Sequence, residues 1–196
     1  MTAVDRYSAN SLKRLLGSLN SVTFRDENGE VEYFGQKVVM LRRDAFQLMK
    51  EELVARNAGG TANLVLGIVG RRVGSEEGKA LMSQGEFQAA RESRSIPTLI
   101  QKAVEETNMG YGKLLIRVLD MSSKTVTVSV RNSFEAENAR DQEMTCCFFL
   151  LGYVEGLFSE FLAAQVRGSE TYCVAKGDQS CVFELGPALQ GSKWKL

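Results

Sequence analysis

Histidine is absent from this chain of 196 residues. Its absence excludes the Ser-His-Asp and Cys-His arrangements that activate a nucleophile. It also excludes metal binding or proton transfer through imidazole. Any metal or reactive site in this protein must therefore be built from its four cysteines, its carboxylates and other groups.

Excess charge of either sign and long apolar runs are also missing. Lys and Arg total 24, as do Asp and Glu, so no basic surface indicates nucleic-acid binding. No run approaches the roughly 20 apolar residues of a membrane helix. The N-terminus lacks the apolar core of a signal peptide. We therefore expect one cytoplasmic domain, in which cysteines favour metal or redox chemistry over structural disulfides.

Hydrophobic periodicity indicates a mixture of helices and strands. Alternating valines predict a strand at 125–130, paired with an apolar strand at 114–119. Turn residues between 22–24 and 31–34 predict a hairpin. The segment 85–96 is polar, which fits a loop or a loosely packed helix. Apolar residues at helical spacing predict helices over 6–19, from 44, over 61–84, from 95, and over 142–165.

Glycines recur at helical spacing in two of these segments. Gly70, Gly74 and Gly78 lie four residues apart and so share one helix face. Gly152 and Gly156 repeat the pattern in the helix predicted at 142–165. The glycine face either approaches a ligand or packs tightly on another helix. The matching patterns favour a close crossing of the two helices.

The cysteines fall into two pairs. Cys146 and Cys147 are adjacent in the helix predicted at 142–165, with Cys147 on its apolar face and Cys146 rotated about 100° away. Cys173 and Cys181 flank a predicted hairpin. If its turn spans 176–178, these two cysteines lie directly opposite each other on one face.

Three interpretations of Cys147, Cys173 and Cys181 remain open from spacing alone. They are buried and inert, or Cys173 and Cys181 form a disulfide, or all three bind zinc with one more ligand. Glu170 is the nearest oxygen donor. However, residues three apart in a flat strand point to opposite faces, so Glu170 joins Cys173 only if the strand is interrupted.

Several motifs occur together in an order that is similar to a known family. The chain contains Gly70 and Gly74 in an early helix, a Gly-x-Gly before the strand pair, and Asn132-Ser-Phe-Glu-Ala before the cysteine-bearing helix. It closes with Glu-x-x-Cys-x3-Gly-Asp-x2-Cys-x-Phe at 170–183. From about Val31 to Leu185 the chain resembles the vinyl-4-reductase domain family. The segment 24–41 also resembles the region that precedes this domain in aromatic-responsive transcriptional activators.

This resemblance implies a fold, an assembly and a metal site. The implied fold is α/β (α+β), an antiparallel sheet packed with long helices, like the subunits of the transport protein particle. Family members commonly form homodimers. The resemblance also implies a structural zinc ion. Its ligands here would be Cys147, Glu170, Cys173 and Cys181. Three thiolates and a carboxylate would leave no position for a reactive water.

The chain also departs from the family. Phenol-sensing relatives use a histidine and a tryptophan in their pocket, whereas the only tryptophan here is Trp194, so phenol itself is not expected. No ATPase motif Gly-x4-Gly-Lys-Ser/Thr occurs. No nucleotide or flavin motif supports the reductase chemistry in the family's name. We therefore expect a protein that is not an enzyme.

The resulting hypothesis is a regulatory, ligand-binding sensory domain. We expect an N-terminal helix and hairpin extension over 1–30, the family domain over 31–186 and a tail over 187–196. A small apolar or aromatic ligand would lie between helix 96–108, the strands and helix 142–165. The expected lining residues are Phe87, Leu99, Ile100, Ala103, Ile116, Val126, Val128, Leu151 and Phe183. The alternatives are a dimeric protein–protein adaptor and an accessory or carrier protein in tetrapyrrole biosynthesis.

Overall fold

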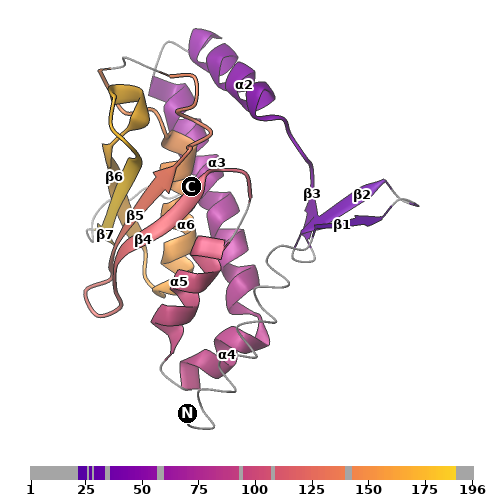
Figure 1. Ribbon diagram of the computed structural model, residues 1–196, viewed down its shortest axis with the longest axis vertical. Coiled ribbons are helices and arrows are strands. Elements are labelled where there is room, and N and C mark those ends of the chain that lie inside the picture. The colour runs from indigo at the N-terminus through magenta and orange to yellow at the C-terminus, as the bar shows by residue number, and fades with distance from the viewer. Residues whose placement is uncertain are drawn as a thin grey trace.

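A computed structural model gives the fold of the chain (Figure 1). It describes residues 22–25, 27, 29–33, 36–56, 60–92, 95–106, 109–139 and 143–188. The helix predicted at 6–19 and Trp194 lie outside these ranges. The structure confirms the predicted fold class, because long helices pack with antiparallel sheets.

The central sheet has four antiparallel strands in the order β4-β5-β7-β6. Both predicted strands are present, and Val126, Val128 and Val130 are almost completely buried on one face of β5. The cysteine hairpin supplies the other two strands. The four strands are β4 (Lys113–Asp120), β5 (Thr125–Arg131), β6 (Val166–Tyr172) and β7 (Cys181–Pro187).

Helix α6 (Phe148–Phe161) packs against the central sheet, and helix α3 (Gly60–Met82) runs beside α6 (Figure 1). A Cβ atom added to Gly74 would lie 2.0 Å from the carbonyl oxygen of Tyr153, and one added to Gly152 would lie 2.0 Å from that of Gly67. The two backbones are therefore in direct contact. The predicted close crossing is confirmed, and the touching backbones leave no space for a ligand between these glycines.

Smaller elements surround this core. The predicted hairpin is confirmed as β1 (Val22–Arg25) and β2 (Glu30–Tyr33), and β3 (Gln36–Val38) extends it into a three-stranded sheet. Figure 1 shows this small sheet on the far side of α3 from the central sheet. The remaining helices are α2 (Arg43–Arg56), α4 (Gly85–Glu92) and α5 (Ile96–Glu106).

Two sequence predictions about helices need correction or refinement. The polar segment 85–96 contains a packed helix, α4, in which Phe87 is fully buried and stacks on Phe161 at 5.9 Å. The helix predicted over 142–165 is shorter, since Cys147 has φ −93° and ψ 60° and precedes the first helical residue. Within the described residues, no helix is long and apolar enough to cross a membrane.

Candidate metal centre

The β6–β7 hairpin places two cysteines at its closed end. Cys173 follows the last residue of β6, and Cys181 is the first residue of β7. The turn between them spans 174–180, which is longer than the predicted 176–178. It consists of a short 3-10 helix, η1 (Val174–Lys176), followed by Gly177 with φ 96°, a conformation that favours glycine. A carboxylate oxygen of Asp178 accepts the Cys173 N–H at 2.8 Å and closes the turn.

A β-bulge in β6 removes the difficulty over Glu170. The register shifts between Glu170 and Tyr172, and Glu170 lies opposite Phe183. Phe183 shares a face with Cys181, two residues earlier in β7. The extra residue in the bulge therefore returns Cys173 to the face that Glu170 already occupies.

Helix α6 supplies the third cysteine from its N-terminal end. The Cys147 sulfur lies 3.5 Å from that of Cys181, and the Cys181 sulfur lies 3.9 Å from that of Cys173. All three cysteines are at most 1% exposed. One ligand atom from each of Cys147, Glu170, Cys173 and Cys181 lies within 4.8 Å of the others. The structure thus brings together the four residues predicted to bind zinc.

The two carboxylate oxygens of Glu170 have different surroundings. Its Oε2 accepts the backbone N–H of Cys147 at 3.0 Å. Its Oε1 is buried and has no hydrogen-bond partner among the residues that the structure describes. Burial raises the pKa of this carboxyl to about 7. A cation bound between Glu170 and the sulfurs would pair the free oxygen and favour its ionised form.

The sulfur separations fit a tetrahedral zinc site. Zn–S bonds of about 2.3 Å at tetrahedral angles place two sulfurs about 3.8 Å apart. The observed 3.5 and 3.9 Å bracket this value. Contacts with the neighbouring thiols, together with burial, raise the pKa of Cys147 far above its ordinary range. A bound cation would instead favour its thiolate, because a coordinating thiol is deprotonated.

A buried acid that sequence reasoning overlooked starts helix α6. Glu135 is fully buried, and its carboxylate accepts the N–H groups of Phe149 at 3.1 Å and Leu150 at 2.7 Å. Lys50 of α2 lies 3.7 Å from this carboxylate and donates to the Cys146 carbonyl at 2.7 Å. Burial raises the pKa of Glu135 to about 7, while Lys50 and the helix N–H groups oppose the rise. The signal for this role was its place in the Asn132-Ser-Phe-Glu-Ala motif, just before the helix.

The predicted ligand-lining residues form part of the apolar core. Ile116 and Leu151 are half-buried and pack against it. The other seven are buried with at most 7% exposure. They are Phe87, Leu99, Ile100, Ala103, Val126, Val128 and Phe183.

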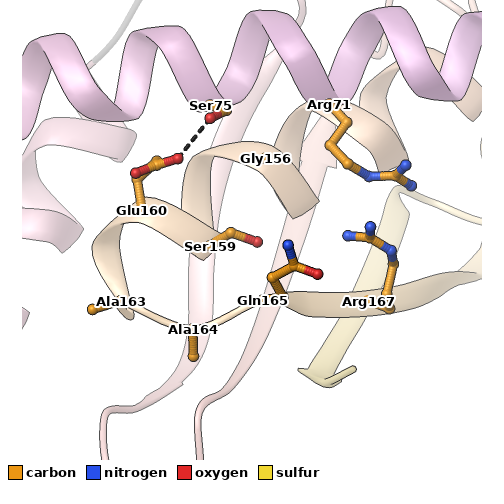
Figure 2. A pocket seen from close by; sticks show the side chains of 9 residues that line it. All are labelled: Arg71, Ser75, Gly156, Ser159, Glu160, Ala163, Ala164, Gln165 and Arg167. Carbon is orange, nitrogen blue, oxygen red and sulfur yellow. Dashed lines mark hydrogen bonds between the residues drawn. The ribbon is translucent and has the colours of Figure 1, made fainter. Parts of the chain in front are cut away.

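None of these nine residues lines the cavity of about 330 Å³ that the structure shows (Figure 2). That cavity lies where the C-terminal half of α6 meets α3 and β6. Figure 2 shows the guanidinium groups of Arg71 and Arg167 facing each other at one end. Arg71 donates to buried Glu155 at 2.9 Å, and Ser75 donates to Glu160 at 2.6 Å at the other end. The lining therefore mixes polar with small apolar residues and carries both signs of charge, unlike the predicted apolar pocket.

Glu77 is another buried acid, on the α3 side of the helix crossing. It is 8% exposed, and within the described ranges its Oε1 has no hydrogen-bond partner. Burial raises its pKa to about 7, and a hydrogen bond with Tyr153 of α6 opposes the rise. Its negative charge helps to raise the pKa of Tyr111, which burial brings to about 12.

The C-terminal part of the chain, residues 126–187, matches the V4R domain model. This range contains β5, α6 and the β6–β7 hairpin, and so all four candidate metal ligands. The predicted resemblance to the vinyl-4-reductase domain family is confirmed for this part of the chain.

A curated relative covers more of the chain. The phenol regulator MopR of Acinetobacter guillouiae is 26% identical over an alignment of 194 residues, which includes 90% of this chain and 32% of the relative. The chain thus spans about a third of the length of that regulator.

Two solved structures share the fold. The phenol-responsive sensory domain of the transcription activator PoxR, solved with phenol, has a TM-score of 0.73 at 17% identity. That alignment covers 95% of this chain and 92% of that domain. Subunit 3 of a trafficking protein particle complex from Naegleria fowleri, covalently bound to palmitic acid, has a TM-score of 0.52 at 14% identity. It covers 74% of this chain and 95% of the subunit. The predicted relation to both kinds of protein is therefore confirmed at the level of the fold.

Proposed function

We propose that this chain is a sensory, regulatory domain that binds a small apolar or aromatic molecule and holds a structural zinc ion. The observation that carries the proposal is its alignment with a phenol regulator over nine-tenths of the chain. The curated relative is a regulator, which supports a role other than catalysis.

Zinc is the metal that best suits the four-residue cluster. Three thiolates and one carboxylate match its preferred donors, and the buried Oε1 of Glu170 has no hydrogen-bond partner within the described part of the chain. The ion would link the start of α6 to the β6–β7 hairpin and supply folding free energy. With four protein ligands it would have no open position, so its role would be structural.

The expected ligand pocket contains only apolar side chains. The nine residues come from α4, α5, the central sheet and α6, and none carries a hydrogen-bonding side-chain group. The relatives MopR and PoxR are named for phenol. In this chain the expected pocket would select by shape and apolar contact, so we expect aromatic hydrocarbons or other apolar molecules rather than phenol.

Metal analysis tests the zinc assignment. We expect the purified wild-type protein to contain one zinc ion and Cys181→Ser to contain much less. Chelation should destabilise the wild type by about 4 kcal/mol, the linkage expected when free zinc exceeds its Kd 1,000-fold. The measurements are elemental analysis and chemical unfolding with and without chelator. Absence of zinc from both proteins would refute the metal assignment.

Thermal unfolding with a panel of apolar and aromatic compounds tests the sensor assignment. A compound at 100 times its Kd should stabilise the protein by about 2.7 kcal/mol. Ala103→Val should abolish this shift, because Ala103 is fully buried among the expected lining residues. Ala62→Val, the same change at a buried position near the start of α3, should keep it. No shift with any compound, or equal loss in both variants, would count against the pocket.

An adaptor function has one observation in its favour. Apolar side chains are exposed between β3 and α2, on α2 and on the first half of α3. Val39 is 89% exposed, Met40 68%, Leu48 60% and Leu64 58%. Exposed apolar surface of this kind marks an interface, and a homodimer is its expected use here. Sedimentation of Leu48→Glu and Leu64→Glu, against the exposed polar change Glu52→Gln, would show whether this surface joins two copies.

A further inference from the structure

Cys146 lies beside the candidate metal centre, although the predicted ligand set leaves it out. It precedes Cys147, the residue before helix α6, so it has no helical position of its own. Its sulfur is 3.8 Å from the sulfur of Cys173. It is half-buried, whereas the other three cysteines are buried. Cys146 therefore contacts the cluster from its solvent side.

The Cys146–Cys173 distance suits two sulfurs bound to the same metal ion. Tetrahedral zinc with bonds of about 2.3 Å requires about 3.8 Å between sulfurs. The observed 3.8 Å matches this value at least as well as the separations that Cys181 makes with Cys147 and Cys173. The four sulfurs thus form a chain of three contacts, Cys146–Cys173, Cys173–Cys181 and Cys181–Cys147, each close to the separation of two sulfurs on one zinc ion.

Glu170 is the ligand that Cys146 can replace. Its Oε2 accepts the Cys147 N–H, whereas Oε1 has no hydrogen-bond partner among the described residues and is the oxygen that we assign to the metal. If Oε1 leaves the metal, that hydrogen bond remains and the start of α6 is not disturbed. Cys146 loses a proton when it binds the metal, and the displaced carboxylate of Glu170 takes one up, so the exchange leaves the net charge of the site unchanged.

The surroundings of Cys146 hold it close to the cluster. Its carbonyl oxygen accepts a hydrogen bond of 2.7 Å from the Lys50 ammonium group. Its sulfur lies 3.6 Å from the carbonyl oxygen of Glu135. The Lys50 side chain is only 12% exposed. Its positive charge on this side of the cluster offsets part of the negative charge of a fourth thiolate.

We propose that Cys146 is an alternative fourth ligand that replaces the carboxylate of Glu170. The inference rests on the proposed metal site and deepens it. The chain then holds its metal with three thiolates and a carboxylate or with four thiolates. The second set favours softer, thiophilic metals. Cys146 is also the cysteine that an ion arriving from solvent meets first.

Cobalt(II) titration of four proteins tests the proposal, with cobalt as an optical probe of thiolate ligands. They are the metal-free wild type, Cys146→Ser, Glu170→Gln and the double variant. Glutamine keeps an acceptor for the Cys147 N–H but lacks the anionic oxygen. We expect Glu170→Gln to bind one cobalt with a stronger thiolate-to-cobalt absorption than wild type. We expect the double variant to bind at least about 10-fold more weakly than Glu170→Gln, a loss of the size that follows removal of a group supporting a metal site.

The possible outcomes distinguish a failure of the Cys146 proposal from a failure of the proposed metal site. Equal affinity and equal absorption of Glu170→Gln and the double variant would overturn the role of Cys146 while leaving the metal site intact. A wild type that binds no cobalt would refute the metal site itself. If Glu170→Gln does not fold, Glu170→Asp, which shortens the same side chain, replaces it in the test.

Alkylation and mass spectrometry give a second readout. Cys146 should react quickly in the metal-loaded wild type and be protected in the Glu170 variant. Equal reactivity in both would overturn the proposal.

Discussion

Helix α6 is held in two different ways at two places along its length. Where it crosses α3, glycines let the two backbones touch, and added Cβ atoms would lie 2.0–2.1 Å from carbonyl oxygens at Gly70, Gly74, Gly152 and Gly156. At its N-terminal end, buried acids and thiols surround it. Glu170 accepts the N–H of Cys147, the residue before the helix, and Glu135 accepts those of Phe149 and Leu150.

The two places differ in what controls them. The crossing depends on shape, because close-packed backbones leave no room for one more atom. The N-terminal end depends on charge, because it holds buried carboxylates near Lys50 and a cluster that suits a metal ion. Solution conditions that change metal content should therefore act on the end of α6, while small changes of volume should act on the crossing.

Gly74→Ala breaks the crossing and should have the largest effect. Its Cβ would lie 2.0 Å from the Tyr153 carbonyl oxygen, so the helices must separate. We expect a loss of about 4 kcal/mol in the free energy of unfolding, measured by chemical denaturation. Gly67→Ala, on the same helix, is the control. Its Cβ would lie 3.6 Å from the nearest atom, so alanine should stabilise the helix by up to about 1 kcal/mol. Equal effects of the two changes would contradict the role of shape.

Glu135→Ala tests the N-terminal end of α6. It removes the acceptor of two helix N–H groups and also the carboxylate that pairs with Lys50. We expect a loss of about 3 kcal/mol, since removal of one partner strands a buried charge. Glu137→Ala is the matched control, because Glu137 is 47% exposed in its pair with Arg43 and should cost at most about 1 kcal/mol. Similar losses in both variants would show that the buried acid does not hold the helix start.

Glu77 tests whether the helix crossing depends on shape alone, because it is a titrating group located there. Its pKa is about 7 in the folded protein, against an ordinary value of 4.5. Between these values the folded state binds more protons than the unfolded state, so stability falls as pH rises from about 4.5 to about 7. Glu77→Gln should flatten this fall and stabilise the protein by about 2 kcal/mol at pH 8, with little effect at pH 4.

Unfolding at a series of pH values checks the Glu77 prediction. The neighbouring Glu76→Gln is the control, since Glu76 is exposed and pairs with Lys79. A pH profile that stays the same in Glu77→Gln would mean that Glu77 does not titrate in this range. The groups facing Glu77 are Tyr153 and Tyr111, and burial raises the pKa of both, so neither titrates in this window.

Much of the fold follows from local sequence patterns. The alternating valines at 126, 128 and 130 predict a half-buried strand, and the glycines at 70, 74 and 78 predict a helix face in close contact. These predictions succeed because strand and helix periods are properties of short segments. The four candidate metal ligands were grouped by family resemblance, and the structure places them together.

Other features depend on contacts between distant segments, which no local period encodes. The true start of α6 is set by carboxylates of Glu135 and Glu170, which lie 14 and 23 residues from the N–H groups they accept. The predicted helix ran through Cys146 and so turned its sulfur away from the cluster, whereas the structure places it near Cys173.

The amino-acid sequence is enough to predict two glycine-bearing helices and a closing hairpin. It also limits the side chains that can form a site, since it has four cysteines and no histidine. Only the tertiary structure decided where those groups meet. A one-residue bulge in β6 brings Cys173 to the face that Glu170 occupies, and the non-helical residues before α6 place the Cys146 sulfur beside that of Cys173. The physical reason is that strand register and helix starts are selected by the packing and hydrogen bonds of the whole domain.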